Sequence, residues 1–240
     1  MAPYTVQFQK SEIVAEGTMA FFFTKPADFK FKAGQSIDLT LINPPETDAE
    51  GTTRAFSIAS APYNTELMIA TRMRDTAFKR VLKSLPEKTE LKMEGPFGSM
   101  TLHNDTARPA VILAGGIGIT PFLSIARQAT HEKLLHQVFL FYSNRRPEDT
   151  AFLDELRFLE KENSHYKFIG TMTETEKSKV PWTHEKGYIN KEMILRYLPD
   201  LKTPIYYTAG PPTMVQAMRE MLNKAGVDDD YIRSEEFAGY

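Results

Sequence analysis

The residues most able to do chemistry in this 240-residue chain form a glycine-rich turn between an apolar strand and a helix. Residues 111–114 (VILA) are a continuous apolar run, which indicates a strand covered on both faces. Gly115, Gly116 and Gly118 follow, and Pro121 suits the first helical turn because its missing N–H would be unpaired there anyway. Free N–H groups at a helix start attract phosphate, and glycines allow close approach. The turn is therefore a candidate nucleotide site.

This turn alone leaves two interpretations open. The usual dinucleotide fingerprint has a further glycine after Gly118, where this chain continues to Pro121. It also has an acidic residue about twenty positions on, at the end of the next strand. Here the strand 138–142 runs into Ser143, Asn144 and Arg145. The glycines are equally compatible with a strand-turn-helix corner in which they serve only tight packing.

Composition excludes several classes of function. A net charge of −2 and the absence of a basic run argue against nucleic acid as a partner. We expect no membrane span, because no apolar run approaches about twenty residues, and residues 1–10 lack a signal-peptide core, which favours a cytoplasmic protein. The absence of cysteine removes disulfides, thiolate nucleophiles and the usual iron-sulfur clusters. The five histidines show no paired spacing, so we expect no metal site.

The first hundred residues read as short strands separated by turn signals, interrupted by one helix. We expect strands at 5–9, 19–24, 36–42, 53–58, 66–73 and 90–94. Apolar residues at helical spacing predict a helix over 76–85, with Asp75 or Thr76 as its N-cap. Six strands with this spacing predict an antiparallel β-barrel.

The pattern changes to strand-helix alternation after residue 104. We expect strands at 110–114, 137–142, 166–171 and 205–209, and helices at 120–129, 147–162, 191–197 and 212–225. Alternation of this kind predicts a parallel, Rossmann-like α/β sheet with right-handed crossovers. The chain is thus expected to form two domains, 1–103 and 104–240, and to act as a monomer. The last ten residues are expected to form no long element.

A second candidate site lies on the predicted strand 53–58. Alternation places Arg54 and Phe56 on one face and Ala55 and Ser57 on the other. An arginine fork can clamp a diphosphate, an aromatic ring can lie along a flat ligand, and the serine can supply a hydrogen bond. The alternative is an edge strand with one solvated arginine and one core phenylalanine.

Two further glycine-proline corners carry the same kind of signal. Gly95-Pro96-Phe97-Gly98-Ser99-Met100 makes a rigid turn at the end of the barrel, although many such corners only end hairpins. Ala209-Gly210-Pro211-Pro212-Thr213-Met214 follows the last sheet strand, at the edge where ligands collect in open parallel sheets.

Together these four motifs, RAFS, GPFGSM, GGIGITP and AGPPTM, resemble the ferredoxin-NADP reductase family of flavoproteins over nearly the whole chain. They are similar to the family's R-x-Y-S, G-P-x-G, G-G-x-G-x-T-P and C-G-P-P-x-M. The resemblance implies that the barrel domain binds FAD and that the second domain binds NAD(P)H. It also implies that hydride passes from nicotinamide to flavin N5 in the cleft between the domains.

In the barrel, the resemblance implies that Arg54 binds the FAD diphosphate and that Ser57 hydrogen-bonds near flavin N5. Phe56 stands where the family usually has tyrosine, so one hydrogen bond is lost while stacking is kept. Asp75 departs from the family's small-residue helix start, and a capping role is the simpler interpretation for it. Backbone N–H groups of residues 76–78 remain available to phosphate. The other implied flavin-site residues are Ala55, Thr71, Arg72, Met73, Thr76, Ala77, Phe78, Gly95, Pro96 and Gly98.

In the second domain, the resemblance implies that the glycine turn cradles the pyrophosphate and that Thr120 approaches the nicotinamide. Ala209 replaces the family's cysteine, which either slows hydride transfer or marks a subfamily. The tail SEEFAGY implies a place near the nicotinamide for Glu235 and makes Phe237 and Tyr240 rivals for the exposed flavin face. The nucleotide-site residues implied in this way are Gly115, Gly116, Gly118, Thr120, Pro121, Gly210, Pro211 and Met214. Catalytic roles are implied for Ser57, Thr120 and Glu235.

NADH is favoured over NADPH as the substrate. Family members that use NADP commonly place Ser/Thr-Arg after the third sheet strand, whereas Thr173 here precedes Glu174, whose charge should repel a 2′-phosphate. The alternative is compensation by nearby cations, which otherwise form a solvated charged face. These are Arg145, Arg146, Lys177 and Lys179.

The predicted function is that of an FAD-dependent NAD(P)H oxidoreductase, in which the protein orients two cofactors that do the chemistry. With no cysteine to hold a cluster, the electrons must go to a separate acceptor. The candidates are ferredoxin, flavodoxin, a partner oxygenase, and small molecules such as free flavin or quinone. Two alternatives remain: a flavin reductase that uses flavin as a diffusing substrate, and a non-catalytic, regulatory flavin-binding subunit.

Overall fold

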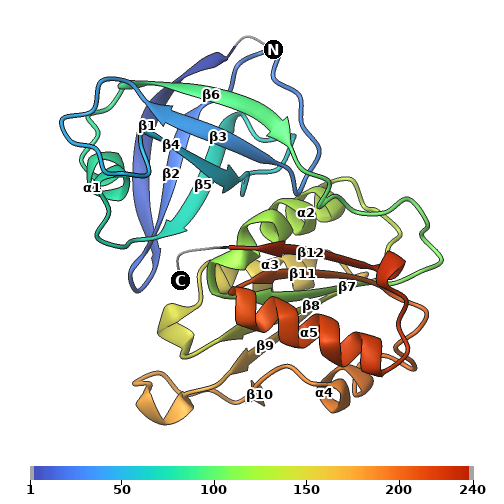
Figure 1. Ribbon diagram of the computed structural model, residues 1–240. Coiled ribbons are helices and arrows are strands. Elements are labelled where there is room, and N and C mark those ends of the chain that lie inside the picture. Colours follow the sequence, from blue (N-terminus) through green and yellow to red (C-terminus); the bar gives the residue numbers. More distant parts are fainter. Residues whose placement is uncertain (1–2, 238–240) are drawn as a thin grey trace.

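The computed structural model describes residues 3–237, which form two domains joined side to side (Figure 1). The first domain contains six strands and one helix. They are β1 (Tyr4–Ala15), β2 (Thr18–Thr24), β3 (Ser36–Leu41), β4 (Thr53–Ser57), β5 (Glu66–Arg72), α1 (Ala77–Lys83) and β6 (Glu90–Phe97). Each predicted strand and the predicted helix is therefore present, with shifted ends.

The first sheet is antiparallel throughout, in the order β4-β3-β6-β1-β2-β5. It curls, but β4 and β5 do not pair into a ladder, so the predicted barrel is not closed. The edges are linked after the end of β4, where the Ala59 N–H donates to the Met68 carbonyl at 2.7 Å. Beyond Ser57 the chain turns to the second domain, which engages the carbonyls of Ala59 and Ser60. That engagement explains the open edge.

Alternating side chains fill the inside of the curled sheet. On β3, Ile37, Leu39 and Leu41 are buried while the residues between them are partly exposed. This period of two is what a strand with one covered face requires. The same core contains apolar residues from β1, β2, β5, β6 and α1.

The start of α1 corrects one expectation. Thr76 is the N-cap, because its hydroxyl accepts from the Lys79 N–H at 3.3 Å. Asp75 instead forms an ion pair with Arg80. The expected capping role of Asp75 is therefore wrong, because the carboxylate is drawn to a cation one turn along the helix.

The second domain is a six-stranded parallel sheet in the order β10-β9-β8-β7-β11-β12. Its strands are β7 (Ala110–Gly115), β8 (Val138–Asn144), β9 (Tyr166–Met172), β10 (Glu185–Lys186), β11 (Ile205–Gly210) and β12 (Ile232–Glu236). Its helices are α2 (Thr120–His131), α3 (Leu153–Glu162), α4 (Lys191–Leu195) and α5 (Pro212–Lys224). Short 3-10 turns are η1 (Gly116–Ile119), η2 (Pro147–Asp149), η3 (Thr175–Lys177) and η4 (Asp229–Tyr231).

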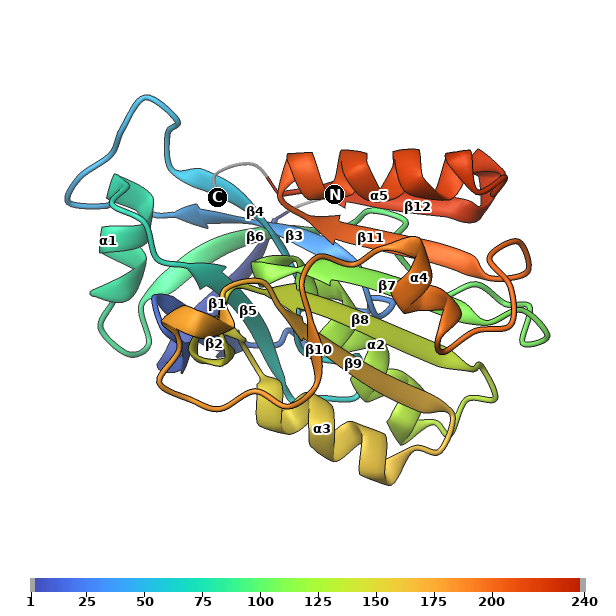
Figure 2. The same ribbon diagram turned by 90° about the horizontal axis from the view of Figure 1, so that it is seen from below.

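Helices cover both faces of this sheet, with α2 and α3 on one side and α4 and α5 on the other (Figure 2). Along β7, Ile112 and Ala114 face α2 and α3, while Val111 and Leu113 face the opposite core. The strand is buried along its whole length. Coverage on both faces explains the continuous apolar run in the sequence.

One prediction for this domain is wrong. The helix expected over 147–162 is split into η2 and α3, because Phe152 adopts a left-handed backbone with φ of 62°. The tail, expected to form no long element, contributes the short strand β12, which pairs in parallel with β11 from Ile232 to Glu236 and was not predicted. Polar residues dominate β12, so alternation of apolar side chains did not reveal it.

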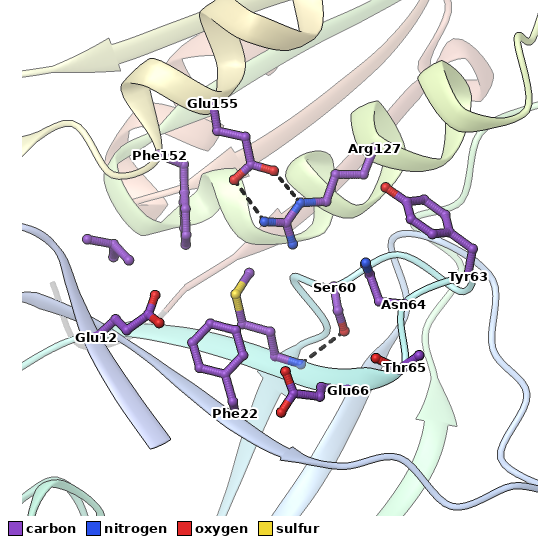
Figure 3. A pocket seen from close by; sticks show the side chains of 12 residues that line it. Glu12, Phe22, Ser60, Tyr63, Asn64, Thr65, Glu66, Arg127, Phe152 and Glu155 are labelled. Carbon is purple, nitrogen blue, oxygen red and sulfur yellow. Dashed lines mark hydrogen bonds and ion pairs between the residues drawn. The ribbon is translucent and has the colours of Figure 1, made fainter. Parts of the chain in front are cut away.

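The domains meet where α2 packs against the outside of the first sheet (Figure 3). The Ser124 hydroxyl donates to the Ser60 carbonyl at 2.7 Å, and Arg127 donates to the Ala59 carbonyl at 3.0 Å. The same guanidinium forms a two-pronged ion pair with Glu155 of α3, at 2.6 and 2.8 Å. These bonds fix the first sheet relative to two helices of the second domain.

Within residues 3–237, no helix has the length and apolar character needed to cross a bilayer.

Gly34, at this junction, provides a test of the packing. Its φ is +95°, and a Cβ placed there would lie 2.0 Å from the Met100 carbonyl oxygen. We expect Gly34→Ala to lower the free energy of unfolding by about 2 kcal/mol or more, since backbone strain and overlap add. Gly17→Ala is the matched control, because φ is +66° and nothing lies within 4 Å. Equal losses in urea denaturation of the two variants would contradict the close approach.

Candidate functional site

A cavity of about 770 Å³ opens at the carboxyl ends of the parallel strands. Its walls come from the segments that follow β7, β8, β9 and β11. In the sheet, β8 lies on one side of β7 and β11 lies on the other, so the strand order changes direction at β7. The cavity therefore lies at the switch point of the sheet. Its lining includes Gly115, Gly116, Ser143, Asn144, Arg145, Thr173, Glu174, Pro211, Thr213 and Met214.

The glycines of this region have two different tasks. Gly115 and Gly116 line the cavity, and a Cβ on Gly115 would lie 2.3 Å from the Met214 sulfur. Gly118 does not line it: its Cβ would lie 2.3 Å from the Ala209 carbonyl oxygen. A Cβ on Gly210 would lie 3.0 Å from the Gly115 carbonyl oxygen. The packing interpretation therefore applies to Gly118 and Gly210, while Gly115 and Gly116 lie on a cavity wall, where the nucleotide interpretation stays a prediction.

Another cavity, of about 470 Å³, lies at the end of the first domain and is called the first cavity below, whereas the 770 Å³ cavity of the second domain is called the second cavity. Ser57 and Thr120 both line it, so the two sequence motifs meet in one space although they belong to different domains. The Ser57 hydroxyl is buried and has no hydrogen-bond partner among residues 3–237. A buried polar atom of this kind calls for a ligand, since leaving it unpaired is costly. The other lining residues are Glu50, Arg54, Ala55, Phe56, Ala70, Thr71, Arg72, Arg74, Thr76, Lys79, Ile117 and Phe237.

The two cavities adjoin, because Arg72 and Arg74 line both. Neither guanidinium forms an ion pair with any of the residues that the structure describes. Two cations left without counter-charges at the junction favour an anionic ligand there. Arg72 was expected beside the flavin, whereas Arg74 was not anticipated.

Lys79 adds a third cation to the first cavity. Its ammonium donates to the Arg72 carbonyl at 2.7 Å. Burial lowers the pKa of Lys79, and the charges of Arg74 and Arg54 lower it further. A bound anion would relieve this repulsion.

Arg54 lines the first cavity but is already engaged by residues of its own chain. Its Nη2 forms ion pairs with Asp48 and Glu50, each at 3.0 Å. The second oxygen of Asp48 accepts from the Ala77 N–H at 3.1 Å. One of the backbone donors expected to be available to phosphate is therefore occupied by a carboxylate of the chain.

Phe56 is both a core and a cavity residue. Its ring packs against that of Phe78, with centroids 5.8 Å apart, and it also lines the first cavity. Phe78 itself is 2% exposed and lies in the barrel core. The core interpretation and the ligand interpretation of Phe56 are thus compatible.

The tail reaches the first cavity through Phe237. The Phe237 N–H donates to the Gly210 carbonyl at 3.0 Å, which continues the pairing of β12 with β11. Glu235 lies opposite Ala209 in that pairing and does not line either cavity, and burial raises its pKa. Tyr240 falls outside the described residues.

The structure thus collects most, but not all, of the predicted site residues. Those that line neither cavity are Met73, Ala77, Phe78, Gly95, Pro96, Gly98, Gly118, Pro121, Gly210 and Glu235. Several of these hold backbone in place: the Met73 N–H donates to the Gly17 carbonyl, and a Cβ on Gly95 would meet Ile37 at 3.0 Å.

Sequence reasoning missed other lining residues. Asn144 is 7% exposed and its side-chain nitrogen has no partner among residues 3–237, although it lines the second cavity. Its place at the end of a predicted strand was the available signal. Tyr188 and Ile189 also line that cavity but come from an irregular segment with no pattern to reveal them.

Sequence comparison finds similarity to a family of nucleotide-binding domains and to reductase components of oxygenases. Residues 112–220 match the family of oxidoreductase NAD-binding domains. The propane 2-monooxygenase reductase component of Rhodococcus jostii (strain RHA1) is 29% identical over 219 residues, covering 89% of this chain and 57% of that protein. The glycine betaine monooxygenase reductase subunit of Chromohalobacter salexigens is 26% identical, covering 92% of this chain and 60% of that protein. The chain thus spans less than two thirds of these relatives.

Solved structures share the complete two-domain arrangement. The Amycolatopsis cytochrome P450 reductase GcoB superposes with a TM-score of 0.83 at 20% identity, over 98% of this chain and 70% of that one. A ferredoxin NADP+ reductase from Neisseria gonorrhoeae, with bound FAD and NADP, superposes with a TM-score of 0.80 at 20% identity, over 98% of each chain.

The chain has the two-domain fold of the ferredoxin-NADP reductase-like proteins, with one cavity at the end of each domain. Its residues 112–220 match the model of the oxidoreductase NAD-binding domain family. The resemblance inferred from the four motifs is confirmed.

The burial of Glu235 gives a pH-dependent stability. Its pKa is raised above the ordinary value of 4.5, so the folded protein binds this proton more tightly than the unfolded chain. The ionised carboxylate therefore opposes folding, and the penalty appears as the pH rises above 4.5. We expect Glu235→Gln to have a higher thermal midpoint than the unmodified chain at neutral pH and no advantage below pH 4.5.

The matched control is Glu236→Gln, because Glu236 is exposed on the same strand. It should show no such pH-dependent gain. A Glu235→Gln advantage that is constant from acidic to neutral pH would contradict the assignment.

Proposed function

We propose that this chain is an FAD-dependent NAD(P)H oxidoreductase that passes electrons to a separate acceptor. The observation that carries the proposal is the adjoining pair of cavities, one at the end of each domain, with Ser57 and Thr120 on the walls of one of them. A reductase needs its two cofactors to meet in one cleft that excludes water.

The first cavity has the features that FAD requires. Ser57 supplies an unpaired buried hydroxyl, Phe56 supplies an aromatic wall, and a row of cations suits the phosphates. Bound there, FAD would supply a ring that can accept hydride from the nicotinamide and pass the electrons on to the acceptor. Ser57 and Thr120 would orient the two rings, and Phe237 would shield them from solvent.

The second cavity has the features that a nicotinamide nucleotide requires. Gly115 and Gly116 line it between the end of β7 and the following helical turn, together with Pro211 and Met214 from the segment after β11. Asn144 offers an unpaired side-chain nitrogen as a donor. Arg72 and Arg74 would lie between the two cofactors, where phosphate charges need neutralising.

The acceptor is proposed to be a separate protein. The relatives named above are reductase components or subunits of oxygenases, which by their names work with another component. An oxygenase component is therefore the first candidate, with ferredoxin or flavodoxin as the next. The monomeric state and the cytoplasmic location remain predictions from the sequence.

NADH is proposed as the preferred donor. Glu174 lines the second cavity, and it forms an ion pair with the exposed Lys177 at 3.0 Å. Of the four cations considered for a 2′-phosphate, Arg146 forms ion pairs with Asp149 and Glu16. Arg145 is the one of the four that lines the cavity. A carboxylate in this position disfavours an additional phosphate.

The test of the proposed function is to load the purified protein with FAD and to add NADH and NADPH separately without oxygen. We expect loss of the visible flavin absorbance with NADH, and steady turnover when an artificial one-electron acceptor is present. Failure of both nucleotides to bleach a bound flavin would support a regulatory flavin-binding subunit. Bleaching only of added excess flavin, with none retained, would support a flavin reductase.

Donor preference provides a second prediction. Glu174→Arg should lower the ratio of kcat/KM for NADH to that for NADPH by about tenfold or more, since repulsion is replaced by attraction for the 2′-phosphate. Glu176→Arg is the matched control, because Glu176 lies on the same turn but does not line the cavity. An equal shift in both variants would indicate a general charge effect and contradict the assignment.

A further inference from the structure

The guanidinium of Arg54 is almost fully used by its own chain. Its Nη1 donates to the carbonyls of Glu50, Gly51 and Thr53, at 2.8 to 3.0 Å. Its Nη2 contacts Asp48 and Glu50. An arginine has five N–H donors, and the four on its terminal nitrogens face these partners, so the Nε–H is what remains for a ligand.

The local charge also opposes an incoming anion. Asp48 and Glu50 face the one guanidinium of Arg54, so these three groups together carry a net negative charge, although cations line the same cavity. Burial works to raise the pKa of Asp48, but bonds from the Glu50 N–H, Arg54 and the Ala77 N–H lower it overall. Asp48 therefore stays ionised, and its negative charge persists near neutral pH.

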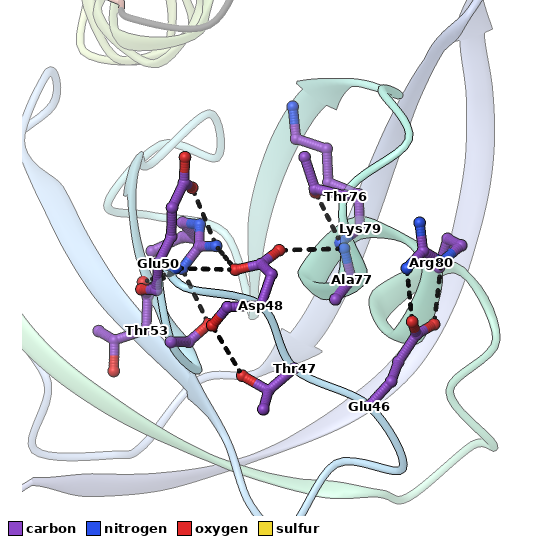
Figure 4. A network of polar contacts seen from close by, with 11 residues as sticks. Glu46, Thr47, Asp48, Glu50, Thr53, Thr76, Ala77, Lys79 and Arg80 are labelled. Carbon is purple, nitrogen blue, oxygen red and sulfur yellow. Dashed lines mark hydrogen bonds and ion pairs between the residues drawn. The ribbon is translucent and has the colours of Figure 1, made fainter.

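The loop that carries these carboxylates is anchored from the other side (Figure 4). Glu46 forms a two-pronged pair with Arg80 of α1, at 3.0 and 2.5 Å. Asp48 is held by the Ala77 N–H of the same helix. The acidic loop, residues 46–50, thus spans from α1 to Arg54 and keeps its carboxylates in place.

From these contacts we propose that Asp48 is an internal competitor for Arg54 that sets the affinity of the site for phosphate-bearing flavins. The inference rests on the proposed function, which places flavin phosphate at Arg54. FAD binds the form in which Asp48 has left the guanidinium, so the apparent affinity equals the intrinsic affinity multiplied by the fraction of molecules in that form. Riboflavin, which has the same ring and no phosphate, is indifferent to Asp48. The loop therefore makes FAD exchangeable rather than permanently bound.

Asp48 and Glu50 could instead position Arg54 for the ligand. The two roles predict opposite changes in the affinity for FAD when the carboxylates are neutralised. Carboxylates that merely position Arg54 would strengthen phosphate binding, and their neutralisation would weaken it. The count of donors favours competition, because positioning leaves donors directed at the ligand and here the terminal donors are occupied.

The experiment compares the flavin-free full chain with Asp48→Asn in titrations with FAD and with riboflavin, followed by quenching of flavin fluorescence. Asparagine keeps the size of the side chain and removes its charge. We expect the Kd for FAD to fall about tenfold and the Kd for riboflavin to stay within about twofold. The matched control is Asp75→Asn, whose carboxylate pairs with Arg80 and not with Arg54, and which should change neither value.

Glu50→Gln is the second variant, because its side chain is 73% exposed and its loss is compatible with folding. It should tighten FAD binding in the same direction. An unchanged or higher Kd for FAD in both variants, or equal tightening of riboflavin, would overturn the competitor role while leaving the proposed function intact. Absence of binding of either flavin to the unmodified chain and to the variants would overturn the proposed function as well.

Discussion

The packing of α2 on the outer face of the first sheet is the interaction on which both cavities depend. Small side chains on that face, Ala20 and Ala70, are buried together with residues of α2 in one continuous core. Small residues let the helix approach closely enough for Ser124 and Arg127 to reach carbonyls of the first domain. Thr120 begins the same helix, so the bonds that hold α2 also hold Thr120 in the cavity of Ser57.

A second constraint acts at the carboxyl ends of β7 and β11. The backbones there approach so closely that Gly118 and Gly210 have no room for a side chain. This closeness lets Gly115, Gly116 and Pro211 form one wall of a single cavity. Glycine and proline thus set the geometry at this site, whereas Arg72 and Arg74 of the other domain add two cations to the charged residues of the second domain, Arg145, Asp149 and Glu174. The nucleotide cavity is complete only when both domains contribute.

The sequence predicted the elements that follow a simple period and the site residues that belong to motifs. Alternation located β1 to β6 in the first domain, and apolar runs located β7, β8, β9 and β11. These patterns did not reveal β12, which is an edge strand of mainly polar residues. They also did not reveal the break at Phe152, where no glycine or proline marks the turn. Arg74 and the partners of Arg54 were also missed, because Arg74 belongs to none of the four motifs and Asp48 and Glu50 lie in an irregular loop without a period.

Two features of residues that line the first cavity act in one direction. Phe56 lacks the hydroxyl of the usual tyrosine, and Arg54 is occupied by Asp48 and Glu50. Under the proposed function, each removes an interaction with the phosphate or ribityl end of FAD and leaves the ring contacts in place. Affinity then depends mainly on the ring, which Phe237 and Thr120 help to enclose. A resident cofactor and a diffusing flavin substrate therefore become two limits of one binding equilibrium, and the acidic loop determines where between them this chain lies.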